Sequence, residues 1–320
     1  MFPWPQPVHP LRCDAFIAAA LHDPESGYYA RRIRTVGRRG DFTTTAIISP
    51  ALPAAIASWA SHQFRRSGCR DLIELGPGDG TLAAGVLKSL PWWPRVRLHL
   101  VESSIPLREI QRQRLGTRVC WHADVTSALA ACKGHACIYS NEFFDAFPVR
   151  QFRHTDEGWA EAHVLPDSII WEPVHELPPS SIFERDWNPG QIVEVHESWH
   201  PWFAGLTAHW RAGAMLAIDY GARHEDLYPR QPAGSLRAYF HHQCLTGSEV
   251  FSRPGHQDIT ADVNFTDLID WSRPWTSESR LWSFANFLES HAQVRDQSDR
   301  FLIDENGAGA AFMALEQSCR

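Results

Sequence analysis

The feature that most constrains the fold of this chain is a regular alternation of short apolar segments with helical segments between residues 71 and 140. Each apolar segment is about the length of a strand, and the stretches between them have the apolar spacing of helices. Alternation of this kind predicts right-handed crossovers and a doubly wound parallel sheet, an α/β fold. The expected strands are residues 71–75, 96–102, 118–122, 136–140 and 213–220, and the expected helices between them are 81–90 and 104–115.

The remaining segments suggest additions to this sheet. Residues 149–200 are strand-like and punctuated by Trp and Pro, which predicts a β-rich insertion. Residues 223–275 are rich in loop-forming residues. We expect an N-terminal helical segment over residues 1–65 and one large domain over 66–320. Further helices are expected at residues 13–21, 51–64 and 278–292.

Composition restricts the compartment and the partners. The 320 residues carry a formal charge of −7, which argues against a general nucleic-acid binder. The seven cysteines are odd in number and contain no CxxC pair, which indicates a reducing compartment. The N-terminus lacks the charge pattern of a signal peptide, and no apolar run is long enough to span a bilayer. These features predict a cytoplasmic protein with no membrane partner.

The loop after the first expected strand indicates the ligand. It runs from Glu74 to Gly80, with glycines at Gly76, Gly78 and Gly80. This GxGxG spacing differs from the GxGxxG of dinucleotide sites, where a pyrophosphate lies at the helix N-terminus. The acid Glu74 would repel a pyrophosphate but suits an ammonium group. S-adenosylmethionine (SAM) carries such a group and no phosphate, so the loop favours SAM.

Two further acids follow the next strands in the expected order. Glu102 ends the second strand, where a carboxylate can accept hydrogen bonds from ribose hydroxyls. Asp124 follows the third strand and precedes Val125, where an acid can face the adenine amino group. Either acid alone is more often a helix cap or a solvated residue. Together with the glycine loop they predict a SAM site.

The segment after the fourth strand suggests the chemistry. Asn141 precedes two acids three residues apart, Glu142 and Asp145, beside the expected position of the sulfonium. On a helical turn the two carboxylates would share one face and could hold a cation. An arginine guanidinium fits, because it is planar, forked and protonated, and a carboxylate can accept its proton. As a simple alternative, both acids would only favour a helix start.

These residues also carry a resemblance to the MidA-like family of SAM-dependent methyltransferases. The resemblance spans roughly residues 16–315, and its most specific motifs are NEFFDAFPV at 141–149 and QDITADVNF at 257–265. The other matching segments are residues 23–29, 40–44, 74–80, 101–104, 218–221 and 234–239.

The resemblance implies a class I methyltransferase (Rossmann-like) fold with added elements, and SAM as cofactor. It implies that residues 40–44, with Asp41 and Thr44, form a lid over the cofactor, and that Gln257 and Asp258 lie near the acceptor. Mitochondrial members act in respiratory complex I assembly with protein arginine as methyl acceptor, so a protein substrate is implied here. Ile47, Ala51-Leu52 and the C-terminal residues 312–315 depart from the family pattern.

Two other functions stay open at this point. A SAM-binding assembly factor without turnover would retain the same pocket. Residues 196–200 read His-Glu-Ser-Trp-His, which matches the HExxH pattern of zinc hydrolases. Because Gly190 to Val195 predicts a strand and Pro201 follows directly, a helix carrying both histidines is not expected, and we predict no metal site. A homodimer is compatible with the sequence.

Overall fold

The core of the fold is an eight-stranded sheet in the computed structural model, which describes residues 9–31, 49–91, 95–165, 168–292, 299, 302–304 and 308–320. The strands are β2 (Asp71–Leu75), β3 (Arg97–Val101), β4 (Val119–His122), β5 (Cys137–Asn141), β10 (Ala214–Ala222), β14 (Val263–Asn264), β15 (Thr276–Ser283) and β16 (Phe312–Cys319). Their order is β15-β16-β10-β5-β2-β3-β4, with β14 paired beside β10.

The direction of the pairing confirms the predicted doubly wound sheet. Strand β2 is parallel to both β3 and β5, and β5 is parallel to β10. The chain builds β3 and β4 on one side of β2 and then crosses to build β5 and β10 on the other. Ligands in such sheets bind where the order reverses, beyond the carboxyl ends of the strands. Here that point lies between β2 and β5.

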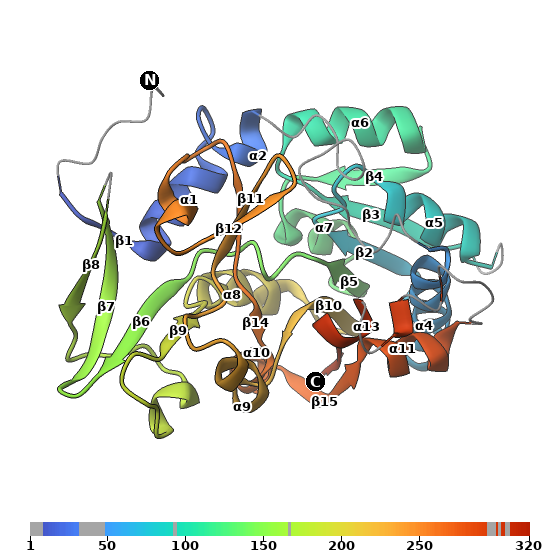
Figure 1. Ribbon diagram of the computed structural model, residues 1–320. Coiled ribbons are helices and arrows are strands. Elements are labelled where there is room, and N and C mark those ends of the chain that lie inside the picture. Colours follow the sequence, from blue (N-terminus) through green and yellow to red (C-terminus); the bar gives the residue numbers. More distant parts are fainter. Residues whose placement is uncertain are drawn as a thin grey trace.

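Helices cover both faces of this sheet (Figure 1). Neighbouring residues of β2 face opposite cores, because strand side chains alternate. Leu72 packs in the cluster that contains residues of α4, α5 and α11, whereas Ile73 packs in the one that contains residues of α7, α8 and α10. These helices are α4 (Ala51–Ser67), α5 (Thr81–Ser89), α7 (Val125–Ala131), α8 (Trp199–His209), α10 (Phe265–Ser272) and α11 (Phe284–His291).

The remaining helices lie elsewhere in the described chain. The other α-helices are α1 (Cys13–His22), α2 (Tyr28–Arg31), α6 (Ile105–Leu115), α9 (His224–Leu227) and α13 (Ala308–Ala311). The 3-10 helices are η1 (Ser181–Glu184), η2 (Tyr228–Arg230) and η3 (Gly247–Phe251). Among the helices described, none has the length and apolarity needed to cross a membrane.

The expected β-rich insertion forms a separate antiparallel sheet. Its strands are β6 (Arg150–Thr155), β7 (Gly158–Leu165), β8 (Ser168–Pro173) and β9 (Ile192–Val195), and they are joined by β1 (Leu11–Arg12). Because β1 pairs with β7, the N-terminal segment is attached to the insertion. The domain division at residue 65 stays a prediction. A third sheet contains β11 (Arg237–Phe240), β12 (Gln243–Thr246) and β13 (Asp258–Thr260).

The prediction of one helix over residues 278–292 is wrong in its first half. Residues 276–283 form β15, which pairs antiparallel with β16, and α11 begins only after Ser283, whose hydroxyl accepts a hydrogen bond from the Asn286 amide at 3.2 Å. The side chains of residues 277–280 are exposed, so this edge strand has no apolar alternation. Its partner strand comes only at the end of the chain, which local sequence does not reveal.

Candidate functional site

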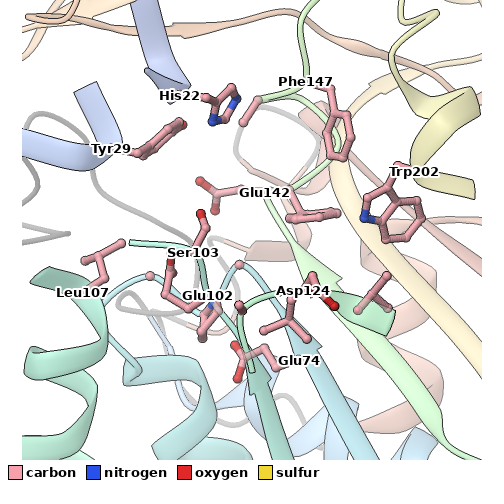
Figure 2. Close-up of a pocket in the computed structure, with 18 of the residues that line it drawn as sticks. His22, Tyr29, Glu74, Glu102, Ser103, Leu107, Asp124, Glu142, Phe147 and Trp202 are labelled. Atoms are coloured by element: carbon pink, nitrogen blue, oxygen red, sulfur yellow. The ribbon is translucent and has the colours of Figure 1, made fainter. Parts of the chain in front are cut away.

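A cavity of about 630 Å³ lies at the carboxyl ends of the parallel strands (Figure 2). The ends of β2, β3 and β5, together with the segments that follow these strands and β4, contribute to its walls, as expected at the reversal point of the sheet. These segments supply Glu74, Gly76–Asp79, Glu102–Ser103, Ala123–Thr126 and Asn141–Phe143. Two further groups of residues enter from elsewhere: His22 and Tyr29 from the N-terminal segment, and Ser198, Pro201, Trp202 and Gly205 from around α8.

The glycine loop brings its backbone close to other groups. Gly76 has φ 61°, and a Cβ at this position would lie 2.9 Å from the ring of Phe143. Gly78 also has a positive φ, and its carbonyl oxygen accepts a hydrogen bond from the Gln111 side chain at 2.7 Å. Gly80 caps the N-terminus of α5 and does not line the cavity. The geometry therefore gives Gly80 a role in turning the chain into α5.

Glu74 is a buried carboxylate at the base of the cavity. Its side chain is 2% exposed, and the hydroxyl of Tyr139 donates a hydrogen bond to it at 2.7 Å. Burial raises the pKa of Glu74 to about 8, because the charged form loses its hydration. Within the described part of the chain no basic side chain forms an ion pair with it. The site can therefore accept a cationic ligand group.

Glu102 lies directly after β3 and is also buried. Its Oε1 atom accepts a hydrogen bond from the backbone amide of Ser104 at 2.8 Å, which fixes the carboxylate at the cavity wall. Burial raises the pKa of Glu102 to about 7. A carboxylate fixed in this way can accept hydrogen bonds from vicinal hydroxyls.

Asp124 combines a structural role with a place in the cavity. Its side chain caps α7 by accepting a hydrogen bond from the Ser127 amide at 2.7 Å, as the simpler interpretation of this acid predicted. The residue also lines the cavity, next to the buried Val125. Both residues thus line the same cavity as Glu74 and Glu102, and their contact with adenine stays a prediction.

Asn141 is the last residue of β5, Glu142 follows it, and the two residues line the cavity together. The Asn141 side-chain amide donates to Oε1 of Glu142 at 2.9 Å. Glu142 has φ 55°, a left-handed conformation that is uncommon for a residue with a Cβ. Its amide donates to the Ile218 carbonyl oxygen at 3.0 Å, which holds the chain in this conformation. Backbone strain of this kind is concentrated at functional sites.

The prediction that Glu142 and Asp145 share one face of a helical turn is wrong. Residues 142–147 form a non-helical turn, because the amides of Phe143 and Phe144 donate to the carboxylate of Asp219 at 3.1 and 2.8 Å. Asp145 is buried outside the cavity, where the Thr260 hydroxyl donates to its Oδ2 atom at 2.7 Å. Its Oδ1 atom is buried without a hydrogen-bond partner among the described residues.

None of the four remaining predicted site residues is among the described residues that line the cavity. Asp41 and Thr44 lie outside the described residues, as does the whole expected lid at 40–44. Gln257 is completely buried away from the cavity, and its side-chain amide donates to the backbone carbonyl of Val250. Asp258 is buried as well, and it accepts a hydrogen bond from Tyr29, which does line the cavity.

The HExxH match does not lie on one helix. His196 follows β9 and stacks on Trp199 with 4.2 Å between ring centroids, whereas α8 begins only at Trp199. Glu197 is paired with Arg150 at 2.9 Å. In the described segments neither His196 nor His200 belongs to a cluster of three potential metal ligands. The arrangement that a zinc hydrolase requires is therefore not formed.

Comparison with known proteins agrees with this geometry. A family described as "Putative S-adenosyl-L-methionine-dependent methyltransferase" matches residues 55–280. The mitochondrial protein arginine methyltransferase NDUFAF7 of Xenopus tropicalis is 28% identical, over 80% of this chain and 66% of the relative. The Homo sapiens protein of the same name is 26% identical, over 81% and 65%. The chain thus spans slightly less than two thirds of the length of these relatives.

A solved structure confirms the class I methyltransferase fold that the sequence predicted. It is described as a "likely methyl transferase" from Burkholderia thailandensis bound to S-adenosyl-homocysteine. The alignment covers 97% of this chain and 88% of that one, with a TM-score of 0.84 and 25% sequence identity.

Proposed function

We propose that this chain, which belongs to the family of S-adenosyl-L-methionine-dependent methyltransferases, binds SAM in the cavity and methylates an arginine side chain of a protein. The observation that carries the proposal is the distribution of carboxylates in one cavity. Glu74 and Glu102 are buried toward one end, and Glu142 lies between them and the wall that contains His22 and Tyr29 (Figure 2). One end therefore suits a cationic cofactor, and the other suits a cationic acceptor.

The residues at the lower end in Figure 2 fit SAM in kind and in order. Glu74 would hold the ammonium group, and Glu102 would accept hydrogen bonds from the ribose hydroxyls. Val125 would offer an apolar surface to the adenine ring, and Asp124 would accept a hydrogen bond from its amino group. When bound, SAM supplies an electrophilic methyl group.

Glu142 is the residue we assign to the acceptor. A protonated guanidinium is a poor nucleophile, so the acceptor nitrogen must lose a proton as it is methylated. Glu142 can orient the guanidinium and accept that proton. Its carboxylate is restrained by Asn141, and its backbone by the Ile218 carbonyl, so little reorganisation is needed. Arginine as acceptor is supported by the names of the relatives, which are protein arginine methyltransferases.

The decisive experiment incubates the protein with radiolabelled SAM and a desalted host lysate, followed by mass spectrometry of labelled peptides. We expect label on arginine of a small number of proteins. Label on another residue type would overturn the assignment of arginine as acceptor. Absence of SAM binding by the protein would overturn the assignment of the cavity as the SAM site.

A SAM-binding assembly factor without turnover is the alternative that the same experiment tests. Micromolar SAM binding with no label in any protein would favour this alternative. The cytoplasmic location and a homodimer stay predictions, and fractionation of the host and light scattering would test them.

A further inference from the structure

We propose that Tyr29 is the residue that contacts the acceptor, presenting its ring to the guanidinium opposite Glu142, and that Asp258 is a positioning residue that holds this ring. The inference rests on the proposed function, because it assigns the acceptor side of the same cavity. It also gives Asp258 a role that differs from direct substrate contact.

Tyr29 reaches the cavity from a distant part of the chain. It belongs to α2 and lines the cavity together with Glu142. Figure 2 shows Tyr29 and His22 on the wall away from Glu74, with Glu142 between them and the lower acids. The residues that fit the cofactor occupy the lower end, so an acceptor has to approach the methyl group from the side of Tyr29.

The Tyr29 ring is fixed by contacts from several elements. Its hydroxyl donates to Oδ1 of Asp258 at 2.8 Å. The ring of His22 stacks on it, with 5.4 Å between centroids and 25° between planes, and the ring of Tyr28 contacts it edge-on at 5.5 Å. The Ser104 hydroxyl donates to its backbone carbonyl oxygen at 2.9 Å. A ring held in this way is preorganised, which lowers the entropic cost of binding.

Asp258 acts on the cavity through Tyr29. It lies in β13, is buried, and does not itself line the cavity. Burial and the nearby carboxylates of Asp258 and Asp145 raise the pKa of Tyr29, so the phenol stays protonated and keeps its hydrogen bond. Since the hydroxyl is engaged by Asp258, the group that Tyr29 offers to a ligand is its aromatic ring.

An aromatic ring opposite a carboxylate suits a planar cation. The guanidinium can lie over the ring while its N–H groups donate to Glu142, because its charge is delocalised over a flat group. A lysine ammonium is a compact, strongly hydrated charge and gains less from the flat ring. The pair of Tyr29 and Glu142 therefore selects for arginine.

The test measures binding of N-acetyl-L-arginine amide to the protein saturated with S-adenosylhomocysteine, by ligand-observed NMR. We expect Tyr29→Leu to weaken binding about tenfold, consistent with a desolvated cation–π contact. Tyr29→Phe and Asp258→Ala should each weaken it about threefold. Asp258→Asn should keep most of the affinity that Asp258→Ala loses, because its amide oxygen can still accept a hydrogen bond from the Tyr29 hydroxyl. Asp270→Ala, on the surface of α10, serves as the control.

The double variant Tyr29→Phe/Asp258→Ala separates positioning from a general structural role. If Asp258 acts through the hydroxyl, the double variant binds the probe no more weakly than Tyr29→Phe alone. Additive losses would overturn the positioning role. A loss of S-adenosylhomocysteine affinity or of melting temperature that parallels the loss of probe binding would show a purely structural effect and would also overturn it.

The outcomes also separate this inference from the proposed function. If the wild-type protein binds the arginine probe but labels no protein in the lysate, the enzyme proposal fails and the contact stands. If the protein labels arginine but Tyr29→Leu binds the probe like wild type, the contact is wrong. Absence of probe binding to wild type, or equal affinity for N-acetyl-L-lysine amide, would overturn the selection for a planar cation.

Discussion

Glu74 is a carboxylate whose surroundings make ionisation costly in the absence of a ligand. Burial raises its pKa to about 8, and the neutral hydroxyl of Tyr139 offsets only part of that cost. A ligand ammonium would reverse the balance, because a nearby opposite charge favours the ionised form. At this position a single substitution can therefore separate ligand binding from folding.

We predict that Glu74→Gln weakens SAM binding at least tenfold, which corresponds to about 1.4 kcal/mol for one lost charge interaction. The glutamine oxygen can still accept a hydrogen bond from the Tyr139 hydroxyl, so the free energy of unfolding should not fall. At pH 7 wild type should release close to one more proton per SAM bound than the variant does. Calorimetry in two buffers of different ionisation enthalpy measures both quantities. Glu109→Gln, on the exposed face of α6, is the control, and unchanged affinity in Glu74→Gln would contradict the assignment.

Glu142 provides the complementary test at the acceptor end. Glu142→Gln keeps the size of the side chain and removes the proton acceptor, so we predict a loss in transfer rate of about 10²–10⁴-fold, the usual contribution of general base catalysis. SAM affinity should change less than threefold. Initial rates with labelled SAM and the lysate acceptor give the first number, and calorimetry gives the second. Equal losses in rate and in affinity would place Glu142 at the cofactor.

At the level of elements, the turn at residues 142–147 shows how β10 shapes the cavity. Asp219 lies in β10 and is completely buried, and its carboxylate accepts hydrogen bonds from the backbone amides of Phe143 and Phe144. These bonds prevent the helix that the spacing of Glu142 and Asp145 predicted. They direct Glu142 into the cavity and Asp145 away from it.

We therefore predict that Asp219→Ala destabilises the protein by about 2–4 kcal/mol, since it leaves buried amides without an acceptor. Asp219→Asn should cost less, because its amide oxygen can replace one carboxylate oxygen. Urea unfolding measures both variants. Asp270→Ala removes an exposed ion pair with Arg273 and should change stability by about 0.5 kcal/mol or less. An Asp219→Asn variant as unstable as the alanine variant would show that the charge matters more than the hydrogen bonds.

The parallel strands could be predicted from sequence because each is a local, largely apolar run, such as Asp71–Leu75, that alternates with helical segments. The edge strand β15 could not be predicted, because its partner β16 is distant from it in sequence and the exposed side chains of β15, at residues 277–280, are polar. The same distinction holds for the site. Glu74, Glu102 and Glu142 lie at the carboxyl ends of strands and could be predicted to line the site, whereas Tyr29 comes close to them only through tertiary packing. No local pattern marks it as a cavity residue.

At the scale of the whole molecule, several buried carboxylates ionise with difficulty, and two of them line the cavity. Burial raises the pKa of Glu74 to about 8, and of Glu102 and Asp267 to about 7. In the unfolded chain these groups titrate near 4–4.5. Through these three groups the folded protein binds more protons than the unfolded chain from about pH 4 to about pH 8, so their contribution to stability decreases as the pH rises through that range.

Unfolded histidines are still about half protonated at pH 6.5, but their contribution is common to wild type and Glu74→Gln and cancels when the two proteins are compared. We predict that, without ligand, the unfolding free energy of wild type falls relative to that of Glu74→Gln by about 1–2 kcal/mol from pH 6.5 to 8.5, at roughly 1.4 kcal/mol per pH unit for a group in its window. Glu74→Gln should show a clearly smaller loss, because glutamine does not titrate. Urea unfolding of both proteins at several pH values measures the difference. Parallel pH profiles would mean that Glu74 is ionised in the free protein, and that its charge is balanced before any ligand binds.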